Sequence, residues 1–272
     1  MGASLLGMEG YNDVRLIIGD YEALSNLKYI VTGFYGLGLC GYLTSRYLCE
    51  VAEELGSFKR IGIVWSTNLP PIVEVNSNGT FNYPVELCQI SEKAGVLLFR
   101  YQVPSSLHVS IADKITDLAK KHDITLILAG GIDIKVFSPD ERENADIVYT
   151  GNSFFKAKLE SGAFRWGISK SPPGVVVSGG IAIFLMFAEM KGVPAVSLLA
   201  PTYAQAGYID NLASLRLARR IIEIFDFGLD TSPLDARIQI ELARLTEMKA
   251  KREPRQRVEE RFESESEEFG IT

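Results

Sequence analysis

The sequence is poor in the two residue types that most often hold metals or form covalent cross-links. Its 272 residues include only three cysteines and two histidines. Cys40, Cys49 and Cys88 are odd in number and lie at no metal-ligand spacing, which argues against a disulfide framework and a zinc site and indicates a reducing compartment. We therefore predict a cytoplasmic protein that folds without disulfides or metals.

The sequence also lacks an excess of positive charge and any long hydrophobic run. Its 34 acidic residues outnumber its 28 basic ones, and the net charge of -6 disfavours binding to nucleic acid or to an anionic membrane. The longest apolar stretch, Val175 to Met190, contains Gly179 and Gly180 and is shorter than the ~20 residues that span a bilayer. The N-terminus has no basic segment before a hydrophobic run, as a secretory signal requires. We expect neither nucleic acid nor membrane as a partner, and we expect the apolar stretch to be buried.

Short apolar runs alternate with helical patterns along most of the chain. Hydrophobic residues make up 47% of the sequence, and a chain of this length is able to enclose a sizeable core. The alternation is typical of an α/β fold with a mainly parallel sheet and helices on both faces. Leu37 to Leu55 and Ser106 to Lys121 are predicted to be crossover helices. The predicted strands are Tyr29 to Phe34, Arg60 to Trp65, Gly95 to Tyr101, Thr125 to Ala129, Asp146 to Thr150, Gly174 to Ser178 and Pro194 to Leu199.

Two further segments stand outside this alternation. Glu74 to Val85 is predicted to be a protruding hairpin, because a turn sequence at Asn76 to Gly79 separates two apolar runs. Asp210 to Asp226 is predicted to be a helix with Asp210 as its N-cap and Gly228 at its C-cap.

Beyond that helix, a second apolar stripe follows the helix-start signal at Thr231 to Pro233. We divide the chain into an α/β core domain at 1–232, a helical appendage at 233–252 and a charged, flexible tail at 253–272. Since the stripe lies outside the expected core, we predict that it, or the Asp210 helix, forms the contact of a homo-oligomer. The stripe consists of Leu234, Ile238, Leu242, Leu245 and Met248.

The sharpest motif is Gly36-Leu37-Gly38-Leu39-Cys40-Gly41, a G-x-G-x-x-G between a predicted strand and a predicted helix. In a dinucleotide site such glycines let backbone N–H groups approach a pyrophosphate. That fingerprint also needs an acidic residue at the end of the next strand, and this strand ends Trp65-Ser66-Thr67-Asn68. We therefore favour close helix–strand packing as the role of the glycines, with nucleotide binding as the alternative.

A second candidate is Gly130-Gly131-Ile132-Asp133, predicted to be a turn at the end of an apolar strand. Ligands bind at such ends in open α/β sheets, but backbone geometry that favours glycine explains the pair equally well. His108, early in a surface-patterned helix, and His122, at the end of that helix, stand near no nucleophile motif. Asp140 to Glu143 is predicted to be a solvated helix start. We assign no catalytic, cofactor-binding or metal-binding residue and expect no cofactor.

Several segments, taken in order, resemble a known family. They are Val31-Thr32-Gly33-Phe34 before the glycine motif, Val176 to Ile181 opening an apolar helix, Gly192 to Leu199 with Pro201, the helix with Asp210 and Ala213, and the turn at Phe227 to Asp230. Together they resemble the proteasome assembly chaperone 2 family, especially its archaeal members, over about Leu27 to Leu245. The resemblance implies a fold similar to purine nucleoside phosphorylases, homo-oligomerisation, and assembly or activation of the 20S proteasome without ATP hydrolysis. It implies no catalytic residues.

The end of the chain departs from that family's pattern. Archaeal relatives that dock on the proteasome end with a hydrophobic residue, a tyrosine and a final residue, whereas this chain ends Phe269-Gly270-Ile271-Thr272. We expect instead that the acidic tail binds a partner through Phe262, Phe269, Ile271 and Thr272, with a merely solubilising tail as the alternative.

The sequence thus predicts a nonenzymatic, oligomeric chaperone or adaptor whose partners are proteasome subunits or another assembly factor. One alternative is a nucleoside-phosphorylase-like or nucleotide-binding enzyme on the same fold, because a fold alone does not decide function. Another is a structural oligomer with an unrelated client.

Overall fold

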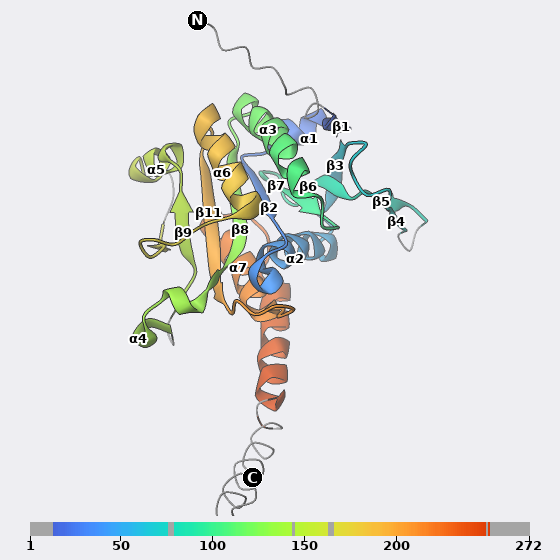
Figure 1. Ribbon diagram of the computed structural model, residues 1–272. Coiled ribbons are helices and arrows are strands. Elements are labelled where there is room, and N and C mark those ends of the chain that lie inside the picture. The colour runs from blue at the N-terminus through green and yellow to red at the C-terminus, as the bar shows by residue number, and fades with distance from the viewer. Residues whose placement is uncertain (1–12, 76–78, 143–144, 163–165, 249, 251–272) are drawn as a thin grey trace, which may run out of the picture.

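The computed structural model describes residues 13–75, 79–142, 145–162, 166–248 and 250. Its strands form a nine-stranded sheet and a separate two-stranded hairpin, surrounded by helices (Figure 1). The strands are β1 Arg15–Ile18, β2 Tyr29–Gly33, β3 Lys59–Trp65, β4 Glu74–Val75, β5 Phe81–Asn82, β6 Val85–Gln89, β7 Ala94–Phe99, β8 Thr125–Asp133, β9 Val148–Gly151, β10 Ser169–Lys170 and β11 Ala195–Thr202. The helices are α1 Tyr21–Asn26, η1 Leu37–Leu39, α2 Cys40–Glu54, α3 Ser105–Lys121, η2 Ile134–Val136, α4 Pro139–Arg142, α5 Ser153–Glu160, α6 Gly179–Lys191 and α7 Asn211–Ile224, followed by a helix at 232–248.

The strand order of the large sheet is β1-β3-β6-β7-β2-β8-β11-β9-β10. Its centre, β7-β2-β8-β11, is parallel. Antiparallel pairing of β6, β3 and β1 extends one side, and antiparallel pairing of β9 with β11 extends the other. The predicted α/β class, with its parallel strands and crossover helices, is confirmed.

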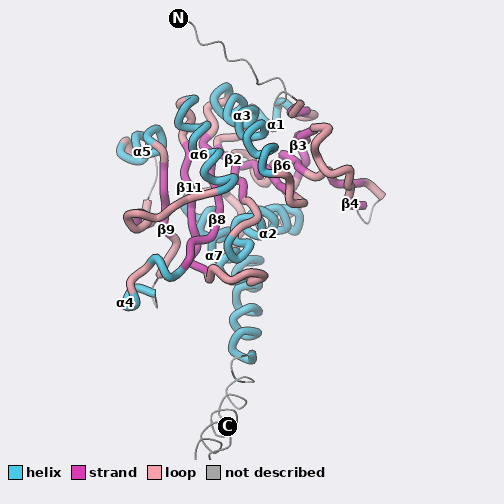
Figure 2. The backbone as a smooth tube through the Cα atoms, viewed as in Figure 1, coloured by secondary structure: helices cyan, strands magenta, loops and turns pink. Residues whose placement is uncertain are grey.

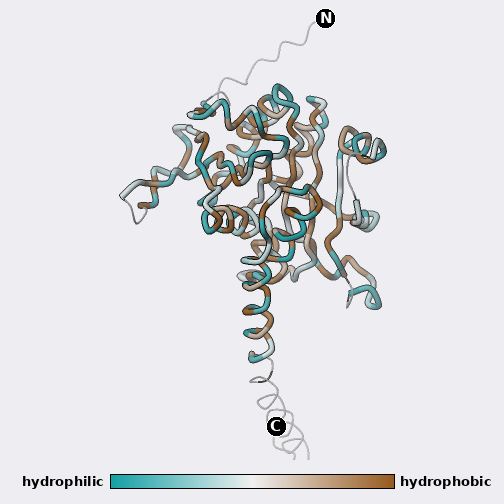
Figure 3. Tube along the Cα trace, turned by 180° about the vertical axis from the view of Figure 1, so that it is seen from behind, coloured by the Kyte–Doolittle hydropathy of each residue, from teal (hydrophilic) through white to brown (hydrophobic). Residues whose placement is uncertain are grey.

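Both faces of the central strands are buried, because successive side chains point to opposite faces. On β8, Ile127 faces the cluster covered by α2 and α7, whereas Leu128 faces the cluster covered by α3 and α6. Figure 2 shows the strands between these two helical layers, and Figure 3 shows hydrophobic segments gathered in the interior. This two-sided burial explains why the central strands are continuous apolar runs in the sequence.

The predicted strand at Gly174 to Ser178 is wrong, because this segment is irregular. Gly174 has a φ of +81° and forms a turn directly after two prolines. Val175 and Val177 nevertheless pack against a small cluster around Ile132 and Phe137. Val175 and Val177 are therefore used for packing alone, whereas Val176 between them is 86% exposed.

The helix α7 begins as predicted but ends earlier. Asp210 is its N-cap and accepts a hydrogen bond from the Ala213 amide at 2.9 Å. The C-cap is Phe225, and the left-handed residue directly after it is Asp226, with a φ of +48°. Gly228 is also left-handed but lies beyond the helix end, so its predicted C-cap role is wrong.

The apolar helix α6 is less buried than predicted. Gly180, Phe184 and Ala188 are its buried residues, whereas Met186 is 57% exposed and Met190 is 78% exposed. One side packs on α3, β8 and β11, and the opposite side is left open. None of the helices in the described part of the chain has the length and apolar composition needed to cross a bilayer.

The helix at 232–248 uses the first part of the predicted stripe inside the chain. Leu234 and Ile238 are buried in the cluster that contains α2 and α7 residues. Arg237 donates to Glu50 on α2 at 2.6 Å and also contacts Glu54. The helix then projects away from the body (Figure 1). Leu234 and Ile238 are therefore not available for the oligomer contact that the stripe suggested.

Candidate functional site

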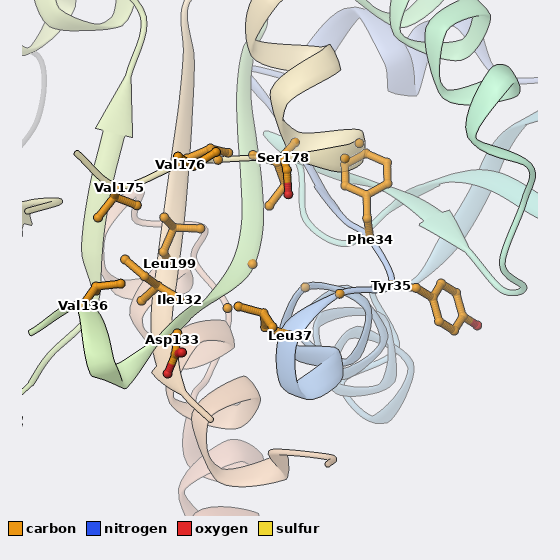
Figure 4. Close-up of a pocket in the computed structure, with 18 residues that line it drawn as sticks. Phe34, Tyr35, Leu37, Ile132, Asp133, Val136, Val175, Val176, Ser178 and Leu199 are labelled. Atoms are coloured by element: carbon orange, nitrogen blue, oxygen red, sulfur yellow. The ribbon is translucent and has the colours of Figure 1, made fainter. Parts of the chain in front are cut away.

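The two glycine-rich motifs meet at one cavity at the carboxyl ends of β2, β8 and β11. Since these strands are parallel neighbours, the loops that follow them lie at the same edge of the sheet. The cavity has a volume of about 260 Å³. Its walls are Phe34 to Leu37 with Gly41, Gly130 to Asp133 with Val136, Val175 to Ile181, and Leu199 (Figure 4).

The glycines on the β2 side serve close packing, as the sequence favoured. A Cβ on Gly41 would lie 2.3 Å from the carbonyl oxygen of Ala129, and a Cβ on Gly33 would lie 1.9 Å from the oxygen of Gly41. Both distances are far below van der Waals contact. These two residues therefore let α2 approach the sheet, whereas a Cβ on Gly36 would meet no atom within 4 Å.

The sheet order does not fit a dinucleotide fingerprint at this turn. In that fingerprint the next strand is the parallel neighbour of the first and carries the ribose-binding carboxylate. Here β3 is separated from β2 by β6 and β7 and runs antiparallel to β6. A carboxylate does lie at the end of β3, because Asp13 accepts hydrogen bonds from Ser66 Oγ at 2.9 Å and from the Thr67 amide at 2.7 Å. That carboxylate is three strands away from the glycine turn.

Gly130 and Gly131 lie inside β8, which continues to Asp133, so the predicted turn at these residues is wrong. A Cβ on Gly130 would lie 2.5 Å from Ile181 Cδ1, and a Cβ on Gly131 would lie 2.6 Å from the oxygen of Leu37. The pair therefore makes room for α6 and for the turn after β2. Both glycines line the cavity, and ligand binding there stays a prediction.

Most of the cavity lining is apolar, with a few polar groups at its rim. Figure 4 shows Ser178 and Phe34 on one side of the space and Asp133 and Leu37 on the other. Ser178 precedes α6, and its hydroxyl forms no capping hydrogen bond with that helix. Asp133 accepts a hydrogen bond from the Lys135 amide at 3.1 Å. Such a lining suits a mostly apolar group held by one or two polar contacts. The sequence analysis assigned no site to Ser178, and the small-residue run Ser178-Gly179-Gly180 is the signal that could have indicated this wall.

His108 faces inward, contrary to its predicted place on a surface-patterned helix. Its ring centroid lies 5.1 Å from that of Phe34 and 5.7 Å from that of Phe99. Burial lowers the pKa of His108 below the ordinary 6.5. The ring lines a smaller hollow of about 110 Å³ that shares Phe34 and Tyr35 with the main cavity. His122 is the C-cap of α3, at the helix end predicted for it.

The remaining candidates are placed as follows. Asp140 and Glu141 open the short helix α4, and Glu141 accepts hydrogen bonds from the amide and hydroxyl of Ser138, which confirms a helix start there. All three cysteines are unpaired and buried, and burial raises the pKa of Cys40 to about 12. Across the described ranges, no group of three or more His, Cys, Asp or Glu side chains is placed to hold a metal ion. The predicted partner-binding residues Phe262, Phe269, Ile271 and Thr272 lie outside the described residues.

Comparison with known proteins places this geometry in a family. The model of the PAC2 family matches residues 30–249. No curated protein matches the chain.

Solved structures share the fold at low sequence identity. PbaA of Pyrococcus furiosus, described as an archaeal homolog of proteasome-assembly chaperone, is 21% identical with a TM-score of 0.67, covering 94% of this chain and 99% of its own. PbaB of the same organism, described as an archaeal proteasome activator, is 16% identical with a TM-score of 0.63, covering 87% of this chain and 99% of its own. A PAC2 family protein from Streptomyces avermitilis is also 16% identical, with a TM-score of 0.59 and coverage of 80% and 94%. With the family match spanning most of its length, the chain belongs to the PAC2 family.

Proposed function

We propose that this protein is a nonenzymatic chaperone or adaptor that acts on the proteasome as a homo-oligomer. The observation that carries the proposal is the PAC2 match over residues 30–249, together with structural neighbours described as a proteasome-assembly chaperone homolog and a proteasome activator. The role is the assembly of the 20S particle or its activation without ATP hydrolysis.

The shape of the carboxyl edge supports a docking role for that side of the molecule. Leu37 at the cavity is 40% exposed, and Tyr203 and Ile209, in the loop that follows β11, are each 52% exposed. The helix at 232–248 continues past the body, and on it Arg244 donates to Glu241 at 2.9 Å. The pKa of Glu241 is lowered first by this bond to Arg244 and then by the nearby Asn211, the first residue of α7. An apolar edge and a projecting helix thus lie at one end of the molecule, and such surfaces mark protein contacts.

Reconstitution tests the proposal. Proteasome α- and β-subunits from the same organism, expressed separately, would be mixed with and without this protein, and particle formation followed by native electrophoresis and peptidase activity. We expect a complex with α-subunits or with the assembled particle, and faster assembly or higher peptidase activity. A protein that neither binds these subunits nor changes either rate would overturn the proposal.

The tail provides a matched pair of variants for the same assay. We expect truncation after Pro254 to leave the fold intact, because the buried residues of the last helix end at Ile238, and to weaken partner binding. Phe269→Ala should reproduce much of that loss, whereas Glu265→Gln should mainly slow association. Unchanged affinity of the truncated protein would assign docking to the folded body.

The cavity favours a second candidate function, an enzyme that acts on a small molecule. Ligands of α/β proteins bind at the carboxyl ends of parallel strands, where this cavity lies. Calorimetric titration with nucleosides and nucleotides separates the candidates, because saturable binding lost in Ser178→Val or Asp133→Asn would support the enzyme.

A further inference from the structure

The cavity at the carboxyl ends of β2, β8 and β11 has one charged group in an otherwise mostly apolar lining. Of the described residues that line it, Asp133 carries a charge, and none is a lysine, arginine or histidine. Ile132 and Leu199 are buried in its wall, whereas Val136 and Val176 are 41% and 86% exposed beside it (Figure 4). Apolar surface of this kind gains free energy when a ligand removes it from water. The lining therefore suits a ligand with an apolar body.

The charge of Asp133 is not neutralised by any ion pair within the described residues. Asp133 is the last residue of β8, and its side chain accepts a hydrogen bond from the Lys135 amide at 3.1 Å. The side chain of Lys135 is exposed and does not line the cavity, and Arg142 donates to the carbonyl oxygens of Phe137 at 3.2 Å and Lys135 at 3.4 Å. A carboxylate that loses its water without gaining a cation costs much free energy. A ligand that covers this wall must therefore bring a positive charge to Asp133.

The volume of the cavity limits the ligand to a small molecule. The cavity measures about 260 Å³, and an apolar cavity of about 150 Å³ in another protein holds benzene. A phenyl ring or an aliphatic chain of similar size therefore fits, with room for a short polar extension. The stem of a lysine side chain has only four methylene groups and would leave much of the wall at Ile132 and Leu199 uncovered. A free small molecule fills this space better than a side chain of a partner protein.

Other classes of ligand fit this lining less well. A phosphate or carboxylate group would face Asp133 without a cationic side chain in the described lining to hold it. A calcium or magnesium ion takes about six or more oxygen ligands, and the described part of the chain places no group of three His, Cys, Asp or Glu side chains to hold a metal. A wholly apolar molecule would cover the carboxylate without replacing its hydration. The lining thus favours a cation attached to an apolar body.

We propose that the cavity binds a free primary amine of low molecular weight, whose ammonium group pairs with Asp133 and whose apolar body lies against Ile132 and Leu199. An ammonium group carries three N–H donors, and a donor and an acceptor that are both charged form a strong hydrogen bond. Ser178 lies on the opposite side of the space from Asp133, so the body of the ligand and not its ammonium group extends toward Ser178 (Figure 4). The inference names a ligand class for the cavity and requires no catalysis there.

Three probes of matched shape test the charge preference of the cavity. The full chain would be titrated with 2-phenylethylamine, 2-phenylethanol and 3-phenylpropionate, and binding followed in the NMR signals of the probes. We expect the amine to bind at least about tenfold more tightly than the alcohol, because a hydrogen bond to a charged partner is worth that much, and the anion to bind most weakly. Added salt should weaken binding of the amine and leave that of the alcohol unchanged. No binding of the amine, or equal affinity for the amine and the alcohol, would overturn the proposal.

A matched pair of variants tests the role of the carboxylate. Asp133→Asn keeps an oxygen that accepts from the Lys135 amide, so the local fold is retained. It should lower the affinity for the amine about tenfold, to that of the alcohol, and leave binding of the alcohol unchanged, which shows that the cavity is intact. Asp140→Asn is the control, since Asp140 is exposed on α4 and does not line the cavity. A preference for the amine that survives Asp133→Asn, or an equal loss in Asp140→Asn, would overturn the proposal.

A fourth probe separates a free amine from a lysine side chain of a protein partner. Nα-acetyl-lysine methylamide carries the same ammonium group on a narrower stem, so we expect it to bind more weakly than 2-phenylethylamine by about threefold or more. Tighter binding of the lysine derivative would assign the cavity to a partner protein and overturn the proposal. The titrations contain no proteasome subunit, so their failure leaves the proposed function to its own assembly assay, and failure of that assay leaves the amine site standing.

Discussion

At the scale of single residues, Gly41 has the strictest requirement among the glycines that line the cavity. Gly41→Ala places a methyl group 2.3 Å from the Ala129 oxygen and 2.9 Å from the Phe34 nitrogen, both backbone atoms that cannot rotate away. We expect a loss of about 3 kcal/mol in the free energy of unfolding, or no folded protein at all. Gly36→Ala is the control and should change stability by less than about 0.5 kcal/mol, because no atom lies within 4 Å and its φ of −171° is extended. Chemical denaturation that ranks the two variants equally would contradict this account.

His108 sets a second residue-scale prediction, on pH. Since burial lowers its native pKa below 6.5, the unfolded chain binds the proton more readily than the native one as the pH falls through 6.5. Stability should therefore be unaffected by this group above pH 6.5 and decline below it. His108→Phe keeps the aromatic contacts with Phe34 and Phe99 and should flatten that part of the profile. Melting temperatures of both proteins, measured from pH 8 to pH 5 in steps of about one pH unit, check this. An NMR titration of His108 with a midpoint above pH 6.5 would refute it.

At the scale of elements, the junction between the β4–β5 hairpin and the large sheet depends on one carboxylate, because Arg60 bonds both Glu86 of β6 and the carbonyl oxygen of Phe81 of β5. Glu86→Gln removes the charge that Arg60 and Arg100 share while keeping the side-chain shape. We expect a loss of about 3 kcal/mol, because Arg100, with a side chain only 17% exposed, would face a neutral group. The surface pair of Arg219 and Glu223 gives a control, since Glu223→Gln should cost less than about 1 kcal/mol. Equal losses in urea denaturation would show that the buried charge has no special role.

The elements that the sequence predicted well are those buried on both faces. The strands at Tyr29, Thr125 and Pro194 are continuous apolar runs in the sequence because helices cover both sides of them in the structure. Gly174 to Ser178 has the same valine-rich composition, but Val175 and Val177 pack without strand neighbours, and single-sequence periodicity does not distinguish the two cases. The edge strand β1, with an alternating and half-exposed pattern, was not predicted at all.

The candidate site was predicted in parts, and its assembly was not. Both glycine motifs were identified, yet whether they meet depends on the strand order, which places β2 beside β8. The β4–β5 segment was predicted as a hairpin, but the exposure of Val75 and Phe81 follows from the absence of a neighbouring strand in the described fold. These facts are set by long-range pairing and have no local signature.

At the scale of the whole molecule, the prediction concerns turnover. Inosine, guanosine or adenosine with phosphate should remain unchanged, because the cavity lining in the described structure offers no lysine, arginine or histidine to hold phosphate. Chromatography of the free bases checks this. Phosphate-dependent release of base that Asp133→Asn abolishes would show an enzymatic function beside the proposed chaperone role.

The attachment of the last helix to α2 sets how far, and to which side, the end of that helix lies from the body of the molecule. Ile238 is the last buried residue of this helix, and Arg237 joins the helix to α2. Residues 239–248 therefore form a spacer about 15 Å long. Because each residue also rotates the backbone about the helix axis by about 100°, the spacer sets both its distance from the body and the side of the axis on which it ends. Deletion of one residue from the spacer would move its end to a different side of the helix axis. Deletion of a full turn would keep the end on the same side and shorten the spacer.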